Sequence, residues 1–96
     1  MSPKNKIKLN ILRKRLDNLD NILLNVIKTR SNLVKEVLKL KNNKSEIVDR
    51  KRINYIFKKI NKKSIQKKID PKITKRIWKS MIWSFIDYER RNFKKK

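Results

Sequence analysis

The longest regular pattern of apolar residues in the chain runs from about Leu9 to Lys41. Within it, apolar side chains recur at alternating intervals of three and four residues, as along the contact seam of a helix that packs against other helices. The members of this seam are Leu9, Leu12, Leu16, Leu19, Leu23, Val26, Leu33, Val37 and Leu40. Arg30 occupies the position that completes the series. Because arginine keeps its charge, a guanidinium in a packing seam needs an anion, which is either an internal carboxylate or a ligand.

This segment predicts a helix about 50 Å long, at about 1.5 Å per residue. Further apolar residues widen its stripe beyond a narrow seam, namely Ile11, Ile22, Ile27, Val34 and Leu38. The chain has only 96 residues, enough for one small domain, and the part outside this helix is too short to cover it. We therefore expect a second copy of the chain to cover the long helix.

A second, shorter helix is predicted after a loop at residues 42–46. Asp49 is a suitable N-cap for it, and the apolar pattern carries it to about Lys63. Its buried face consists of Ile53, Ile56, Phe57 and Ile60. A basic, polar stretch at residues 62–68 follows and is expected to connect this helix to the next one.

The third helix has the clearest start in the chain. Asp70 and Pro71 provide an N-cap and a first-turn proline, and the helix is expected to continue to about Phe93. Its apolar residues are Ile73, Ile77, Trp78, Met81, Ile82, Phe85 and Ile86. The predicted fold class is therefore all-α, with one long N-terminal helix and two shorter helices in a single domain over residues 1–96. Residues 1–6 and 94–96 are expected to be frayed basic tails.

The charge of the chain is strongly basic. Thirty Lys and Arg stand against eight Asp and Glu, which gives a formal net charge of +22. Such a balance suggests a nucleic acid or an acidic membrane surface as a partner. However, the chain lacks Gly, Ala, His and Cys and is rich in Lys, Asn and Ile, which is the composition that AT-rich codons impose. Codon bias is therefore the favoured explanation of the charge.

Several function classes are disfavoured by this composition. Without Cys and His, thiol chemistry and a zinc site are not expected, and without Gly there is no glycine-rich phosphate loop. No apolar run approaches the roughly 20 residues of a membrane span, and the start of the chain lacks the apolar core of a signal peptide, which favours a cytoplasmic protein. The groups left for chemistry are arginines, lysines and carboxyls, with no cofactor expected. They can bind a polyanionic small molecule and stabilise negative charge developing on an oxygen.

Three cations of the long helix are candidates for such a site. Arg30 and Lys41 are eleven residues apart, so that they lie on nearly the same helix face, about 16 Å apart along the axis. Arg13 lies seventeen residues before Arg30, about 25 Å away, too far for both to hold one small molecule within one helix. If two long helices pack antiparallel, Arg13 of one chain can approach Arg30 of the other.

Glu89 continues the apolar stripe of the third helix through Trp78, Ile82 and Phe85. One interpretation is an ion pair with one of the many cations of the chain. The other is a carboxyl that burial keeps protonated, so that it donates a hydrogen bond to a ligand.

Three segments carry a resemblance to a known family. They are LRKRLDNLDNILLNVIKTRSNLVKEVLKLK at residues 12–41, VDRKRINYIF at residues 48–57 and IDPKITKRIWKSMIWSFIDYE at residues 69–89. The most specific part is the opening L-R-x-x-[IL]-x-x-[IL]-D of the first segment, with a later arginine and a closing lysine. In the order and spacing of these three segments, the chain resembles an all-helical chorismate mutase of the AroQ class.

The resemblance implies an intertwined homodimer with two equivalent active sites. It implies that Arg13 reaches into the other subunit's site and, with Arg30, holds the substrate carboxylates. Lys41 would contact the ether oxygen and a carboxylate, and Asp49 would bind near the ring hydroxyl. Arg52, chosen over Arg50 by helix phase, would take the place of the family's second-helix arginine.

Glu89 falls where many members of the family have Gln, the second donor to the ether oxygen. If Glu89 takes that role it must be protonated, and we expect activity to fall as the pH rises and Glu89→Gln to flatten this dependence. Ile53 stands where a Glu is common, and Phe85 stands where a small polar residue is common. Further residues expected to line the pocket are Val37, Ile53, Ile82 and Phe85.

The function implied by the resemblance is the Claisen rearrangement of chorismate to prephenate in phenylalanine and tyrosine biosynthesis. This reaction needs no covalent intermediate and no cofactor. An isochorismate pyruvate lyase of the same fold is the alternative, because those enzymes have an apolar residue after the same arginine, as Ile53 follows Arg52 here. From a different class, a basic helical nucleic-acid-binding protein is suggested by the charge, and weak nonspecific binding of nucleic acid could coexist with an enzyme.

Overall fold

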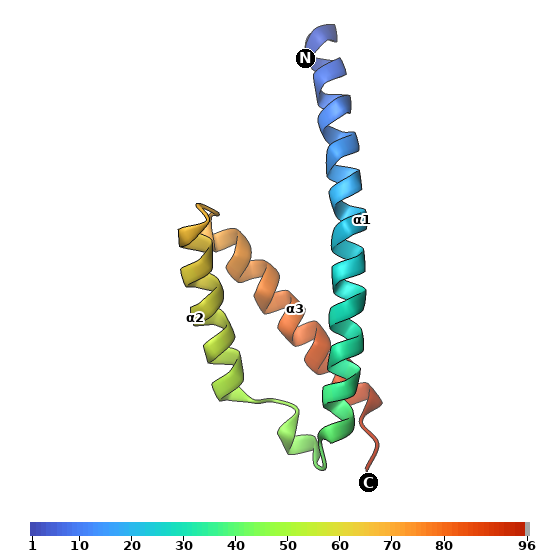
Figure 1. Ribbon diagram of the computed structural model, residues 1–96, viewed down its shortest axis with the longest axis vertical. Coiled ribbons are helices and arrows are strands. Elements are labelled where there is room, and N and C mark those ends of the chain that lie inside the picture. The colour runs from blue at the N-terminus through green and yellow to red at the C-terminus, as the bar shows by residue number, and fades with distance from the viewer. Residues whose placement is uncertain (96) are drawn as a thin grey trace. The chain divides into compact units, whose positions relative to one another are not determined.

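The computed structural model describes residues 1–95 and consists of helices joined by short connections (Figure 1). The long helix α1 spans Pro3–Leu40, a 3-10 turn spans Lys44–Glu46, α2 spans Arg50–Gln66 and α3 spans Pro71–Asn92. No strand occurs among the described residues, so the predicted all-α class with one long and two shorter helices is confirmed. The loop predicted at residues 42–46 contains the 3-10 turn.

The chain consists of two units, one formed by Met1–Leu33 and the other by the chain from Val34 onward. The first unit contains most of α1. Helix α1 has no buried residue, and most of its predicted seam is more than half exposed in this single chain. The exposed large apolar residues of α1 within the first unit are Ile7, Ile11, Leu12, Leu16, Leu19, Ile22, Leu23, Leu24, Val26, Ile27 and Leu33. An exposed apolar stripe of this kind is typical of an interaction surface, and the expectation that a second copy covers it stays a prediction.

Helix α1 begins earlier than expected. Residues 1–6 were expected to be frayed, and the structure is helical from Pro3 onward, with Ser2 capping the helix. Its hydroxyl oxygen accepts a hydrogen bond from the amide of Asn5 at 3.1 Å, and its carbonyl accepts from the amide of Lys6 at 2.9 Å. Pro3 follows at the first helical position, where its fixed φ suits the helix and its missing N–H is not needed. At the other end of the chain, Lys96 lies outside the described residues.

The second unit has a small apolar core. Ile47, Ile82 and Ile86 are buried, and six partly buried side chains pack against them, namely Val48, Ile53, Ile56, Phe57, Trp78 and Phe93. Helices α2 and α3 pack against each other through these residues. Each buried isoleucine contributes about 1.5–3 kcal/mol by leaving water. Most of the predicted apolar face of α2 and the middle of that of α3 are therefore directed toward one core, whereas Ile73 and Ile77 of the predicted α3 face are 54% and 52% exposed.

The α2–α3 connection differs from the prediction of a basic linker at residues 62–68. Helix α2 continues to Gln66, since Ser64 is buried and its hydroxyl bonds both to the carbonyl of Ile60 at 2.6 Å and to the hydroxyl of Thr74 on α3 at 2.7 Å. Lys68 then reverses the chain with a φ of 59°. Around it, the amide of Ile69 donates to the carbonyl of Ser64 at 2.9 Å, which is the bond that closes a Schellman motif.

Both predicted N-caps are confirmed. The side chain of Asp49 accepts a hydrogen bond from the amide of Arg52 at 3.0 Å, and that of Asp70 accepts from the amide of Lys72 at 2.9 Å. These bonds satisfy amide groups that have no partner within the first turn of a helix.

Candidate functional site

An ion pair between Lys41 and Glu89 joins distant parts of the second unit. The Nζ atom of Lys41 lies 2.7 Å from Oε2 of Glu89, and the two side chains are only 16% and 8% exposed. Lys41 directly follows the last residue of α1, while Glu89 lies near the end of α3. Two residues that the sequence singled out for chemistry, 48 positions apart, are thus brought into direct contact.

The position of Glu89 follows from the pattern of α3. Ile82, Ile86 and Glu89 are spaced by four and three residues and are all buried, so the carboxylate lies on the same helix face as the core residues. A buried charge is costly unless it is paired and hydrogen-bonded. The ammonium of Lys41 provides that pairing. Of the two interpretations of Glu89, the ion pair is the one present in this structure.

A surface hollow adjoins this ion pair. It is lined by Lys41, Ser45, Glu46, Val48, Asp49, Arg50 and Lys51. The hollow therefore brings together Lys41 and Asp49, both of which were predicted to bind substrate. It also includes Arg50, which the sequence reasoning set aside in favour of Arg52. The N-capping bond occupies one oxygen of Asp49, and a carboxylate has further acceptor positions.

Glu46 stabilises the loop that contributes Ser45 and Glu46 to the hollow. Its Oε1 accepts hydrogen bonds from the amides of Asn42 at 3.2 Å and Asn43 at 3.1 Å. These bonds fix the chain directly after Lys41, whose own amide donates to the carbonyl of Leu38 at 3.1 Å. Glu46 was not predicted to matter, although an acidic residue within a short polar loop is a recognisable signal for such a cap.

Arg52 lies beside an aromatic ring at the start of α2. Its guanidinium carbon is 5.3 Å from the centroid of the Tyr55 ring, and its side chain is exposed. Arg13 is exposed and Arg30 is partly buried, both on α1 in the first unit. The predicted roles of these three arginines in binding substrate stay predictions.

The residues predicted to line the pocket differ in their burial. Ile82 is a core residue with 6% exposure, and Ile53 packs against that core. Phe85 is partly buried, and Val37 is 47% exposed. Only Val37 among the four presents a large free surface in the single chain.

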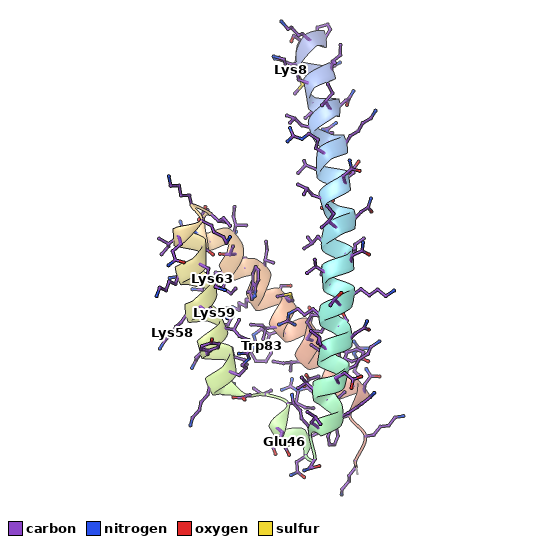
Figure 2. All side chains as sticks on the ribbon, in the orientation of Figure 1. Lys8, Glu46, Lys58, Lys59, Lys63 and Trp83 are labelled. Atoms are coloured by element: carbon purple, nitrogen blue, oxygen red, sulfur yellow. The ribbon has the colours of Figure 1, made fainter. Side chains whose placement is uncertain are left out.

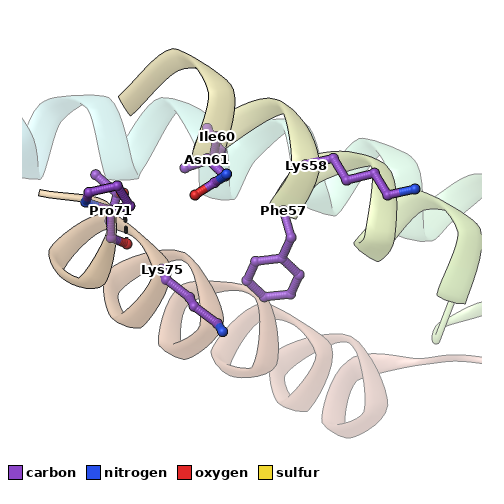
Figure 3. A pocket seen from close by; sticks show the side chains of 7 residues that line it. Phe57, Lys58, Ile60, Asn61, Pro71 and Lys75 are labelled. Carbon is purple, nitrogen blue, oxygen red and sulfur yellow. Dashed lines mark hydrogen bonds between the residues drawn. The ribbon is translucent and has the colours of Figure 1, made fainter. Parts of the chain in front are cut away.

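A separate pocket of about 360 Å³ lies between α2 and α3 (Figure 3). Its lining residues are Phe57, Lys58, Ile60, Asn61, Pro71, Thr74 and Lys75, none of which was predicted as a site residue. The hydroxyl of Thr74 is already bonded to Ser64 at 2.7 Å. No buried side-chain nitrogen or oxygen in the described part of the chain lacks a partner. The pocket therefore offers no unpaired buried group that would fix a ligand.

Within residues 1–95, no three His, Cys, Asp or Glu side chains lie close enough together to hold a metal ion. None of the helices in that range combines the length and the apolarity that a membrane span requires.

Comparison with known proteins supports the resemblance seen in the sequence. The family model described as chorismate mutase type II matches residues 12–90, a range that includes most of α1, all of α2 and nearly all of α3. Both Lys41 and Glu89 lie within it. Neither a curated protein nor a solved structure is similar enough to count as a match. Because the family model covers well over half of the sequence, the chain belongs to the chorismate mutase type II family.

Proposed function

We propose that this protein is a homodimeric chorismate mutase that converts chorismate to prephenate for phenylalanine and tyrosine synthesis. The observation that carries the proposal is the ion pair between Lys41 and Glu89, at 2.7 Å and largely buried, in a chain of the chorismate mutase type II family. It holds an ammonium group in place before any substrate arrives. A donor fixed in advance is what a reaction that develops charge on an ether oxygen requires.

The rearrangement breaks a carbon–oxygen bond and forms a carbon–carbon bond within one molecule. The enzyme has to select the compact conformer of the substrate and stabilise the negative charge growing on the ether oxygen. An ammonium group has three N–H donors, so Lys41 can keep its bond to Glu89 while a second N–H points at the ether oxygen. Glu89 then acts either as the second donor, as the sequence suggested, or by positioning Lys41.

The substrate is a dicarboxylate, and its binding is assigned to arginines. Arg30 and Arg13 of a second copy are proposed to bind the carboxylates, since the guanidinium fork matches a carboxylate with two hydrogen bonds. Asp49, in the hollow that contains Lys41, is proposed to accept from the ring hydroxyl. Arg52 is proposed to assist from α2, with Arg50 as the competing residue because it lines that hollow.

The shared site is supported by the exposed apolar stripe of the first unit. Leu12, Leu16, Leu19 and Leu23 are each more than half exposed, with fractions of 51%, 58%, 58% and 55%. A second copy would cover this stripe and at the same time present Arg13. The C2 symmetry of such a dimer would create the site twice.

The test is turnover of chorismate by the purified protein, with prephenate identified as the product. Lys41→Ala is expected to lower kcat by at least about 100-fold, in line with the loss of one donor to a developing oxyanion. Lys39→Ala is the matched control, because Lys39 lies two residues away and is 71% exposed in a surface ion pair with Glu36. Equal activity of both variants would exclude Lys41 from the catalytic role.

An isochorismate pyruvate lyase is the second candidate, because Ile53 is an apolar residue directly after Arg52. The same assay with isochorismate separates the two activities. Faster release of pyruvate from isochorismate than formation of prephenate from chorismate would favour the lyase.

A further inference from the structure

One face of α2 combines cations with an exposed aromatic ring. From Arg50 to Lys68 the chain has nine Lys and Arg and no Asp or Glu. The residues that share this face are Arg52, Tyr55, Lys59, Lys62 and Lys63. At about 100° per residue they fall within an arc of about 100° on the helix. We refer to these five residues as the α2 stripe.

The α2 stripe lies on a different side of the helix from the core. Ile53, Ile56 and Phe57 pack against the buried residues of the second unit, whereas all five members of the stripe are exposed. Lys59 and Lys63 are labelled on α2 in Figure 2, which shows their places along the helix. No residue of the stripe is part of the core, so its charge is not explained by the packing of α2 on α3.

Tyr55 is the one aromatic residue of the α2 stripe. Its side chain is 52% exposed, the guanidinium carbon of Arg52 lies 5.3 Å from the ring centroid, and Nζ of Lys59 lies 5.7 Å from it. An exposed ring with a cation one turn before it and another one turn after it offers two kinds of contact at once. The ring can stack on a base, and the cations can bind the phosphates on either side.

Like charges repel one another within the α2 stripe. Lys59 and Lys63 are four residues apart on the same face, where like charges destabilise a helix, and α2 contains no carboxylate to offset them. A bound polyanion would remove this repulsion. A compositional bias toward lysine explains the number of cations, but it does not explain a tyrosine held among them on the exposed side.

We propose that the α2 stripe binds single-stranded nucleic acid, with Tyr55 stacking on an unpaired base and Lys59, Lys62 and Lys63 contacting the phosphates. A single strand is specified because the ring needs an unpaired base to stack on. This binding does not depend on the proposed mutase activity. The stripe shares only Arg52 with the proposed substrate-binding residues, and Arg52 is unchanged in the variants below. Neither Tyr55 nor these three lysines belongs to the proposed catalytic site.

The experiment measures the fluorescence anisotropy of a labelled single-stranded oligonucleotide of mixed sequence as the full-length protein is added, at several salt concentrations. The wild type is expected to bind with an affinity that falls steeply as salt rises. The triple variant Lys59→Gln, Lys62→Gln, Lys63→Gln should reduce the slope of log K against log salt by about 2, since each phosphate contact on a single strand contributes about 0.7. Tyr55→Leu should weaken binding roughly 5- to 150-fold, while Tyr55→Phe, which keeps the ring, should not.

Matched controls distinguish the stripe from the net charge of the chain. The triple variant Lys4→Gln, Lys6→Gln, Lys8→Gln removes the same charge from exposed positions of α1 in the first unit. Equal losses for the two triple variants would overturn the proposal, because binding would then follow net charge alone. Inorganic polyphosphate of matched charge is the second probe, because it has no bases. If it binds as tightly as the oligonucleotide, or if Tyr55→Leu has no effect, the stacking role is refuted.

Two further readouts keep the result interpretable. Circular dichroism should show the same helix content for every variant, since all substituted side chains are exposed. Chorismate turnover should be unchanged in the stripe variants. Tighter binding of a duplex than of a single strand, or no binding of either at low salt, would overturn the proposal even if the mutase activity is present.

Discussion

The ion pair between Lys41 and Glu89 allows a quantitative test of how the second unit is held together. Removing one partner leaves the other charge largely buried, with side-chain exposures of 16% for Lys41 and 8% for Glu89. Breaking a buried pair in this way typically costs about 3–5 kcal/mol. Because Lys41 retains some contact with water, we expect Lys41→Met and Glu89→Met each to destabilise the fold by about 3 kcal/mol. That is a large part of the roughly 5–15 kcal/mol that stabilises an ordinary domain.

The double variant Lys41→Met, Glu89→Met measures the effect of removing the whole ion pair. Replacing both charges by methionine leaves no unpaired charge, so the double variant should be destabilised by less than the sum of the two single variants. The surface pair of Lys39 and Glu36 is the control, because its atoms are 3.3 Å apart and its side chains are 71% and 69% exposed. That pair should contribute no more than about 0.5 kcal/mol.

Urea denaturation at fixed protein concentration measures all of these free energies. The concentration has to be fixed because association of folded copies would raise the apparent stability. If the Lys41 and Glu89 variants change the free energy of unfolding no more than the Lys39 and Glu36 variants do, the ion pair does not stabilise the fold. The inference that Lys41 is positioned in advance would then fail as well.

Three further predictions concern Lys68, Ser2 and the pair of arginines Arg13 and Arg30. Lys68→Gly should stabilise the protein by about 0.5–1 kcal/mol in the same urea assay. The left-handed conformation costs a non-glycine residue about 1–2 kcal/mol, and part of this gain is offset because glycine loses more conformational entropy on folding. Lys67→Gly, at a residue with a φ of −88°, should destabilise it instead, and stabilisation by both would refute the argument. Ser2→Ala should speed amide exchange at Asn5 several-fold by removing the 3.1 Å cap, with Ser45→Ala as a control that leaves this amide unchanged. If each site takes Arg13 from the other copy, mixing inactive Arg13→Ala and Arg30→Ala chains should restore about a quarter of wild-type turnover. Half of the dimers then contain one chain of each kind, and each of these dimers has one intact site. No recovery after mixing would show that both arginines act within one chain.

Local signals in the sequence were sufficient to place most helix boundaries. Asp49 and the Asp70-Pro71 pair predicted the starts of α2 and α3, because capping depends only on neighbouring residues. The sequence did not predict where α2 ends. A helix that ends in a Schellman motif is usually recognised by glycine, and in this chain without glycine Lys68 takes that conformation.

The site was predictable only in part. The sequence showed that Glu89 is a carboxyl group on an apolar helix face, and burial of that face followed from the pattern of α3. It did not show which of thirty cations would pair with Glu89, because that depends on how Lys41 and α3 meet in three dimensions. The position of Arg50 in the hollow beside Lys41 depends on the path of the loop at Glu46, which helix phase does not describe.

The role of Glu89 can be decided by comparing Glu89→Gln with the wild type. If Glu89 donates a hydrogen bond to the ether oxygen, glutamine can replace it, because its amide group has N–H donors. If Glu89 acts as a carboxylate that positions the ammonium of Lys41, glutamine lacks the charge that holds this ammonium in place. The 2.7 Å ion pair favours the second role, so we expect Glu89→Gln to have a lower kcat than the wild type. A Glu89→Gln variant as fast as the wild type would instead establish the donor role.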